Sequence, residues 1–323
     1  MIYAPILIPT LCRYDHLVRC IESLKKNGWA KYTDVYVALD YPLKEEHWDG
    51  YRKIKKYLKG DFSEFANFNV IIRDSNYGSG RNMVEMREDI LKRYDRFIRT
   101  DDDCEFSPNF IEYMDKCLQR YEHDPTVMGV TGYSYPIKWI VKDDCNAVKN
   151  NSIFPMWGTG FWRDKFILMQ NNIKDDVFEK MFSERKIKKN SMTVARWIDV
   201  IGSIYKRDKQ DLMHQPADVS FGSYIQIENQ YIITPIKSLV RNYGFDGSGV
   251  YCQNTVNSIA ADNATTYDYV LQEIDCNLNF DLKIDESSNP KLNRKIMDKF
   301  DRRSPILQLK TFIKRIIIEL RWS

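Results

Sequence analysis

The first 133 residues alternate between short apolar runs and longer segments whose apolar residues recur at helical spacing. The apolar runs are typical of buried strands and cover 5–9, 34–40, 68–74 and 96–100. The segments between and after them are predicted helices over 14–28, 45–60, 80–94 and 108–121. Gly28 and Gly60 are expected to end the first two helices, and Ser107-Pro108 to begin the last. Four successive strand–helix units predict a parallel α/β sheet.

Beyond about residue 133 the periodicity becomes weaker, and two short segments stand out. Residues 155–166, PMWGTGFWRDKF, are dense in aromatic side chains and glycine. Residues 242–251, NYGFDGSGVY, contain three glycines and predict a mobile loop. No internal repeat or low-complexity segment is present.

Composition and charge narrow the class of protein. The chain has 323 residues, of which 43% are hydrophobic and 13% aromatic, and this composition is globular. The net charge of +3 is too small to indicate a nucleic-acid partner. The seven cysteines form no CxxC pair, which favours reduced thiols in a cytoplasmic protein. No stretch of 18 apolar residues predicts a membrane span, and the N-terminus is interpreted as a strand instead of a signal peptide.

Polar residues follow the predicted strands at their carboxyl ends, where parallel sheets bind ligands. These residues are Thr10, Arg13, Asp40, Asp74 and the run Asp101, Asp102 and Asp103. Carboxylates are hard oxygen ligands, so the run favours a magnesium or manganese ion beside a diphosphate. If strand geometry continues through the run, Asp101 and Asp103 point one way and Asp102 the other. The structural alternative is an acidic helix N-terminus, which the helix dipole stabilises.

Four segments together resemble a known family. They are PILIPTLCRYDHLVRCIESL at 5–24, the strand ending in Asp40, SNYGSGRN at 75–82, and DDDCEFSPNF at 101–110. In this order they resemble nucleotide-sugar-dependent glycosyltransferases of the GT-A fold. The likeness is to bacterial capsule and O-antigen sugar transferases, and to the N-acetylglucosaminyltransferase that initiates complex N-glycans.

The resemblance covers the chain up to about residue 252 and implies an α/β fold with a mixed, mainly parallel sheet flanked by helices. It places a catalytic domain at 1–252, with a nucleotide-binding half at 1–132 and an acceptor half at 133–252. Residues 253–323 are then a C-terminal extension.

The resemblance also implies a role for each matched residue. Asp103 would bind Mn²⁺ or Mg²⁺, with Asp101 as a second ligand. The donor would contact Pro9, Thr10, Arg13, Asp40, Arg81, Asp101 and Asp102. The transferred sugar and the acceptor would contact Trp157, Gly158, Gly160 and Phe161. Residues 243–251 would fold over the bound donor as a lid, and Tyr251 stands where related bacterial sequences often have histidine.

An inverting enzyme also needs a general base that takes a proton from the acceptor hydroxyl. Asp218 is the first candidate and Asp199 the second, because the family has an aspartate shortly before a P-x-x-S-L segment such as 235–239. A helix N-cap is the structural alternative for Asp218.

The expected function is therefore metal-dependent, inverting transfer of a sugar from a nucleotide diphosphate, most readily UDP. The expected acceptor is a polysaccharide or a lipid-linked saccharide in the synthesis of capsule, O-antigen or other lipopolysaccharide. Two alternatives belong to other classes. A sugar nucleotidyltransferase would carry a glycine-rich, basic motif after the first strand, and IPTLCRYDH lacks one. A non-catalytic carbohydrate-binding protein would not need an intact acidic run.

The segment 304–323 combines apolar residues at spacings of three and four with nearby lysines and arginines. This pattern fits a helix that lies on the inner face of the cytoplasmic membrane, and it fits equally a last helix docked on the catalytic domain.

Overall fold

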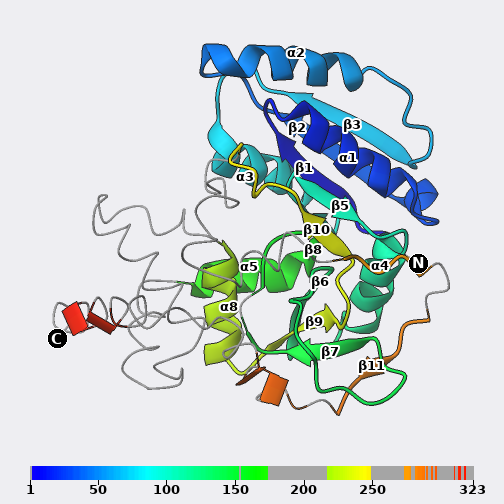
Figure 1. Cartoon of the computed structure of the whole chain (residues 1–323), viewed down its shortest axis with the longest axis vertical. Coiled ribbons are helices and arrows are strands. Elements are labelled where there is room, and N and C mark those ends of the chain that lie inside the picture. Colours follow the sequence, from blue (N-terminus) through cyan, green and yellow to red (C-terminus); the bar gives the residue numbers. More distant parts are fainter. Residues whose placement is uncertain are drawn as a thin grey trace.

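The computed structural model describes residues 2–152, 154–173, 217–248, 273–277 and 281–287, and a few positions between 289 and 317. Across the described residues one sheet runs through the whole fold, in the strand order β11-β7-β9-β6-β8-β4-β1-β2-β3 (Figure 1). Its strands are β1 (Ile6–Thr10), β2 (Asp34–Leu39), β3 (Asn67–Ile72), β4 (Arg96–Arg99), β6 (Val127–Thr131), β7 (Ala147–Asn150), β8 (Thr159–Trp162), β9 (Tyr231–Pro235) and β11 (Ile284–Asp285).

The N-terminal half of the sheet is parallel, as predicted. Strand β1 pairs in parallel with β2 and β4, and β2 pairs in parallel with β3. The connections between these strands are helices, as a parallel arrangement requires. Beyond β4 the sheet becomes mixed, because β8 runs antiparallel to both β4 and β6. The observed fold is thus the mixed, mainly parallel α/β fold expected from the sequence.

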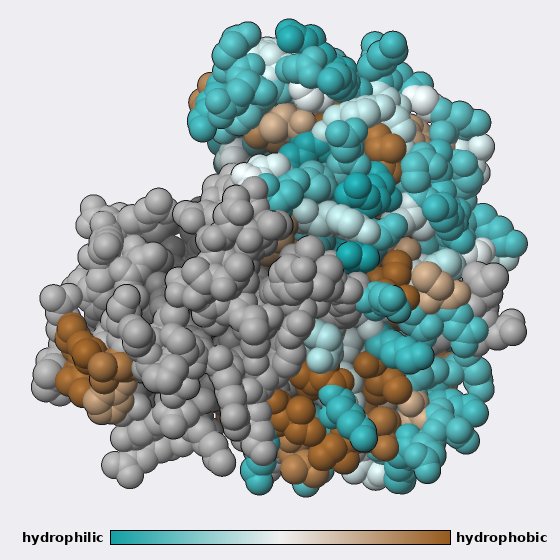
Figure 2. Space-filling view, in the orientation of Figure 1, coloured by the Kyte–Doolittle hydropathy of each residue, from teal (hydrophilic) through white to brown (hydrophobic). Residues whose placement is uncertain are grey.

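Helices cover both faces of the sheet (Figure 1). They are α1 (Tyr14–Lys25), α2 (Trp48–Tyr57), α3 (Gly78–Ile90), α4 (Phe110–Arg120), α5 (Arg163–Asn172) and α8 (Ala217–Ile227), with 3-10 turns at Ala30–Tyr32 and Glu45–His47. The side chains of successive β1 residues point to opposite faces of the sheet, because side chains alternate along a strand. Ile6 and Ile8 pack in the core under α1 and α4, and Leu7 packs in the core under α3 and α5. Figure 2 shows that the outer surface over α2 is hydrophilic.

Three predicted helix ends differ from the structure. Helix α1 ends at Lys25 with Lys26 as its C-cap, so Gly28 is not the cap. Helix α2 ends at Tyr57 with Leu58 as its C-cap, so Gly60 is not the cap either. Helix α4 begins at Phe110 with Asn109 as its N-cap, two residues after the predicted proline start. The reason is that Ser107 and Phe110 first close a separate turn, in which the Phe110 N–H donates to the Ser107 carbonyl at 3.0 Å.

A separate two-stranded ladder lies directly after the acidic run. Strand β5 (Cys104–Phe106) pairs antiparallel with β10 (Val240–Asn242), and Asn242 lies opposite Cys104. The ladder therefore brings the chain after β10 against the residues that precede β5, which are the three aspartates. None of the described helices combines the length and apolar character needed to cross a bilayer.

Candidate active site

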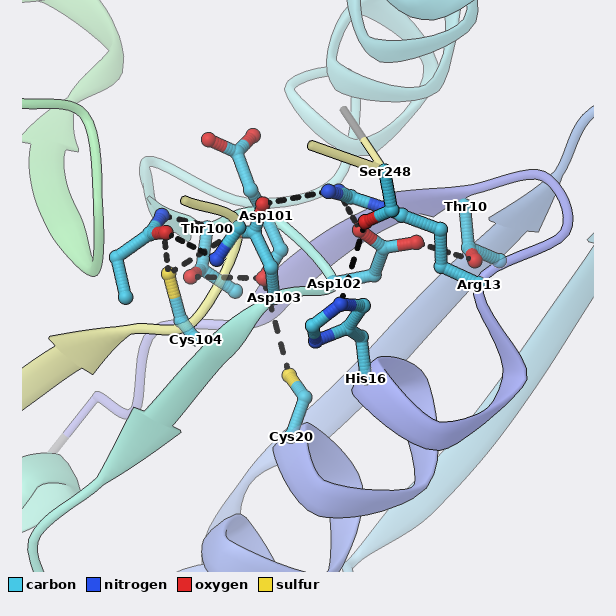
Figure 3. Close-up of polar contacts among 12 residues, drawn as sticks. Thr10, Arg13, His16, Cys20, Thr100, Asp101, Asp102, Asp103, Cys104 and Ser248 are labelled. Atoms are coloured by element: carbon cyan, nitrogen blue, oxygen red, sulfur yellow. Dashed lines mark hydrogen bonds and ion pairs between the residues drawn. The ribbon is translucent and has the colours of Figure 1, made fainter. Parts of the chain in front are cut away.

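The predicted polar residues of β1, α1 and the acidic run meet at the carboxyl edge of the sheet. The Thr10 hydroxyl donates to Asp102 Oδ2 at 2.7 Å. Arg13 Nη1 donates to Asp103 Oδ2 at 2.8 Å, and Arg13 Nη2 donates to Asp102 Oδ1. Figure 3 shows Thr10 and Arg13 reaching toward the aspartates from the end of β1 and the start of α1. The convergence predicted from strand ends is confirmed for these four residues.

The predicted alternation within the acidic run is wrong. Asp102 and Asp103 both bind Arg13, so these neighbours do not point in opposite directions. Asp101 instead accepts a hydrogen bond from Arg99 Nη2 at 3.2 Å. The physical reason is that the strand ends at Arg99 and the aspartates lie in a turn between β4 and β5, where the two-residue period no longer applies.

The chain after β10 closes against Asp103. Asn242 Nδ2 donates to Asp103 Oδ1 at 2.9 Å, and the Tyr243 N–H donates to the Asp103 carbonyl at 2.8 Å. Asn242 Oδ1 accepts from the Gly244 N–H at 2.7 Å, which fixes the orientation of the amide. A Cβ atom at Gly244 would lie 2.1 Å from Asp103 Oδ2, so the close approach requires glycine there. We call residues 242–248 the strap.

The electrostatics of the cluster leave an excess of negative charge. Asp102 and Asp103 are both buried and share the single guanidinium of Arg13. Burial raises the pKa of both carboxyls above the ordinary value, although Arg13 opposes the shift. Burial also opposes the charge of Arg13, but the two aspartates outweigh it and raise the pKa of the guanidinium. Two buried carboxylates with one guanidinium leave one negative charge uncompensated, which favours the binding of a further cation.

The donor set of this cluster fits a magnesium-like ion. Its ligands would be carboxylate oxygens, and such an ion takes one or two of these and completes its shell with water and substrate phosphate. Within the described ranges, no three His, Cys, Asp or Glu side chains come together as ligands of one metal ion. A site here would therefore rest on Asp103, with Asp101 close by in the chain, and on oxygens from the substrate.

Asp40 occupies the N-terminus of α3. Its carboxylate accepts hydrogen bonds from the Tyr77 and Gly78 N–H groups, both at 2.8 Å, and from the Tyr41 N–H at 2.9 Å. A carboxylate at this position accepts hydrogen bonds from the first backbone N–H groups of the helix, which have no acceptor within the helix itself. Gly78 has φ 72°, a left-handed conformation that favours glycine. Asp40 thus holds the SNYGSGRN turn against the edge of the sheet.

Within the described residues, Arg81 and the exposed Asp74 contact residues other than the buried aspartates. The Arg81 side chain is exposed, forms an ion pair with Glu85 at 2.7 Å, and lies over the Tyr77 ring at 4.0 Å. Asp74 accepts a hydrogen bond from Ser75 at 3.2 Å. Pro9 lies in β1 and is half-buried, opposite Ala38 of β2.

The glycine–aromatic segment has mainly a packing role in the described structure. Phe161 is fully buried against Phe97, and a Cβ at Gly160 would meet the Met114 side chain at 2.9 Å. These contacts differ from the sugar-binding role that the resemblance implied for Gly160 and Phe161, because β8 is a central strand buried on both faces.

Gly158 and Trp157 lie nearer the site. Gly158 has φ 60°, and a Cβ there would meet Phe110 at 2.8 Å. Trp157 is half-buried and packs edge-on against Tyr133 and against Phe245 of the strap, with ring centroids 5.1 and 5.8 Å apart. Trp157 is therefore the member of the segment that contacts the strap.

The strap also binds α1. His16 Nε2 lies 2.9 Å from Asp246 Oδ2, and the Arg19 guanidinium lies 4.1 Å above the Tyr243 ring. The Tyr243 hydroxyl donates to Glu105 Oε2 at 2.8 Å. These contacts hold residues 243–248 of the predicted lid over Asp103, while 249–251, including Tyr251, lie outside the described residues.

The predicted general bases fall at the limits of the described chain. Asp218 is the second residue of α8, and its side chain lies outside the description. Asp199 lies outside the described residues altogether.

Asn242 and Arg99 are site residues that sequence reasoning missed. Arg99 stands at the end of an apolar run. A polar residue at a strand end is the signal that predicted the neighbouring aspartates, and it could have predicted Arg99 as well. Asn242 is brought to Asp103 by the pairing of β10 with β5, a long-range contact with no local sequence signal.

Comparisons with solved structures find distant likenesses. TarS residues 1–349 from S. aureus is 14% identical with a TM-score of 0.36, and the match covers 53% of this chain and 50% of that one. A mannosyltransferase from Pyrobaculum calidifontis, solved with GDP-Man and Mn²⁺, is 12% identical with a TM-score of 0.35, covering 50% of this chain and 45% of that one. The chain thus spans half or less of these proteins. No curated protein matches it.

The family follows from the sequence match. Residues 6–190, more than half of the 323-residue chain, match the family described as Glycosyl transferase family 2. The matched region contains β1, the Asp40 turn and the buried Asp102–Asp103 pair. The chain belongs to glycosyl transferase family 2, and its mixed α/β sheet is that of the GT-A fold.

Proposed function

We propose that the protein is a metal-dependent, inverting glycosyltransferase that uses a nucleotide diphosphate sugar, with UDP as the first nucleotide to test. The observation that carries the proposal is the buried pair Asp102 and Asp103, which shares one guanidinium at the carboxyl edge of the parallel sheet. The edge supplies a place for a nucleotide, and the excess charge supplies a place for a cation. Manganese and magnesium are both compatible with carboxylate ligands.

In this proposal the residues of the cluster have distinct tasks. Asp103 would hold the ion, which when bound supplies positive charge to the leaving diphosphate. Arg13 and Thr10 hold Asp102 and thereby keep the acidic turn in one conformation before substrate arrives. Asp40 keeps the turn 76–78 in place beside the expected nucleotide position. Positioning of this kind removes part of the entropic barrier to reaction.

The proton of the acceptor hydroxyl needs a base, and we propose Asp218 for it. Asp218 lies in the first turn of α8, which packs against the same face of the sheet as α5. Removal of this proton as the acceptor oxygen attacks the anomeric carbon gives inversion in one displacement. Closure of the strap over Asp103 would exclude water, which otherwise hydrolyses the donor.

The proposal is tested by measuring nucleotide diphosphate release from a panel of nucleotide sugars, with Mn²⁺ and with chelator. We expect release that depends on the metal and is abolished in Asp103→Asn, with the exposed Asp74→Asn as the matched control. Release of pyrophosphate from a sugar phosphate and a nucleoside triphosphate would instead identify a sugar nucleotidyltransferase. Donor binding without any turnover, with or without candidate acceptors, would point to a non-catalytic carbohydrate-binding protein.

For the acceptor we propose a polysaccharide or lipid-linked saccharide at a membrane surface. Five apolar residues of the C-terminal segment are 37–59% exposed: Leu309, Phe312, Ile313, Ile316 and Ile317. Their spacing places them on one face of a helix, and Lys310 and Lys314 are interleaved in the sequence. The rest of 304–323 lies outside the described residues. Deletion of 304–323 should abolish sedimentation with anionic vesicles and leave donor binding intact. Unfolding of the truncated protein would favour a helix docked on the domain.

A further inference from the structure

The chain after residue 252 returns to the catalytic fold at two places. Strand β11 pairs in parallel with β7 and adds the last strand to one edge of the sheet (Figure 1). The buried Asp285 side chain holds this strand, since it accepts hydrogen bonds from the Lys142 N–H at 2.9 Å and from the Ser287 hydroxyl at 2.8 Å. Earlier in the sequence, Asp275 contacts the β5–β10 ladder. The C-terminal part of the chain is therefore anchored on the sheet independently of the ladder.

Asp275 joins the two strands of the ladder at the end away from Asp103. Its N–H donates to the carbonyl of Ser238, two residues before β10, at 2.9 Å. Its carbonyl accepts a hydrogen bond from the hydroxyl of Ser107, which directly follows β5. The Ser107 N–H also donates to the Leu239 carbonyl at 2.9 Å. Ser107, Ser238 and Leu239 are almost completely buried, so water does not readily replace these hydrogen bonds when one partner is removed.

The ladder depends on such attachments because it is small. It has two strands and three residue pairs, from Val240 to Asn242 on β10. Two strands alone are marginally stable in water. Strand β5 is also fixed to α1, since the Phe106 N–H donates to the Ser23 hydroxyl at 3.0 Å. The start of β10 is held by the loop before it, and Asp275 ties that loop to the end of β5.

We propose that Asp275 and Ser107 are positioning residues of the active site. Through them the C-terminal segment fixes the ladder, and the ladder places Asn242 on the carboxylate of Asp103. Residues beyond 252 are then a working part of the catalytic unit. The placement of Asn242 follows from contacts within the protein, whereas its consequence for the metal rests on the proposed function.

The first test measures hydrogen–deuterium exchange and needs neither substrate nor metal. Ser107→Ala removes the hydroxyl that binds the Asp275 carbonyl. Exchange in a peptide covering 240–244, which includes the Tyr243 N–H bound to Asp103, should become about tenfold faster, while exchange in β1 and β2 stays as in wild type. Ser287→Ala is the matched control, because it removes a serine hydroxyl bound to Asp285 on β11. Equal acceleration in all regions, or none at 240–244, would overturn the proposal.

Asp275→Pro is an independent variant, because proline lacks the N–H that donates to the Ser238 carbonyl. It changes the C-terminal segment instead of the buried serine, so it stays informative if Ser107→Ala does not fold. The same local acceleration at 240–244 is expected. Wild-type exchange at 240–244 in folded Asp275→Pro would contradict the positioning role. Loss of the whole fold in both variants would assign these contacts to overall stability and would contradict it as well.

Calorimetry with Mn²⁺ then tests the link to the metal. Ser107→Ala should weaken Mn²⁺ binding about tenfold, and Ser287→Ala should bind Mn²⁺ as the wild type does. In Asn242→Leu, where the donor to Asp103 is already missing, adding Ser107→Ala should cause little further loss, because both changes act through one contact. Fully additive losses would show that Ser107 acts by another route and would refute the proposed role. If the wild type binds no Mn²⁺ while the exchange results hold, the proposed metal site fails and the positioning of Asn242 stands.

Discussion

Replacing Gly244 by alanine tests whether the strap seats Asp103. The added Cβ would lie 2.1 Å from Asp103 Oδ2 and 3.1 Å from Asn242 Oδ1. Ordinary contacts between such atoms are about 3.5 Å, so the carboxylate or the strap has to move by more than about 1 Å. Gly244 is not in the left-handed region, so its backbone accepts alanine and the perturbation comes from the contacts of the added Cβ, above all with Asp103.

The size of the effect follows from this overlap. Forcing an extra carbon into a filled space typically costs about 1–3 kcal/mol. Asp103 is held by Arg13 on one oxygen and by Asn242 on the other, so neither side yields without breaking a hydrogen bond. If the strain falls on the carboxylate, binding of the metal and donor should weaken about fivefold to more than a hundredfold.

The assay is the initial rate of nucleotide diphosphate release over a range of Mn²⁺ concentrations, together with thermal unfolding. Gly244→Ala should need much more Mn²⁺ for half-maximal rate, while the fold is retained. Gly28→Ala is the matched control, since a Cβ at Gly28 meets nothing within 4 Å. A normal Mn²⁺ dependence in Gly244→Ala, at normal stability, would refute the idea that the strap rests on Asp103 in the working enzyme.

Three further predictions concern single side chains. Asn242→Leu removes the donor to Asp103, so Mn²⁺ affinity measured by calorimetry should fall about tenfold to a hundredfold, and unchanged affinity would contradict this. Burial raises the pKa of Asp115 from its ordinary value of 3.8 to about 7, so between these values the folded protein keeps a proton that the unfolded chain has lost, and stability falls as the pH rises toward 7. The free energy of unfolding in urea should therefore drop by about 1 kcal/mol from this group between pH 6 and 7 and change little from it above pH 8, and Asp115→Asn should remove that drop. Asp218→Asn should lower turnover about 10²–10⁴-fold with donor affinity unchanged, whereas Asp199→Asn should be mild. Lost donor binding would make Asp218 a binding residue.

Local patterns in the sequence were sufficient to predict the strands and helices of the N-terminal half of the fold. Each strand from β1 to β4 is an apolar run followed by an amphipathic helix, and burial of both sheet faces makes that pattern strong. The parallel pairing then follows from the helical connections. The edge position of Thr10, Arg13 and the aspartates follows in turn, because all strands of a parallel sheet end at the same side.

Helix ends were less predictable, because several local arrangements compete there. Gly28 is a good C-cap by residue type, but Lys26 closes α1 in the αR conformation. Ser107-Pro108 is a good helix start, but the Ser107 carbonyl accepts from the Phe110 N–H and completes a turn first. The free energies of these arrangements differ by little, so packing of the neighbouring elements selects between them.

Tertiary structure alone decided how the carboxylates are used. The sequence determined that three aspartates stand at a strand end. Their directions were settled by Arg13, which binds Asp102 and Asp103 together, and by Arg99, which binds Asp101. Asn242 reaches Asp103 from 139 positions away through the β5–β10 ladder. Such contacts depend on which strands pair across the fold, and the energy of that pairing is spread over the whole core, so no local pattern in the chain encodes it.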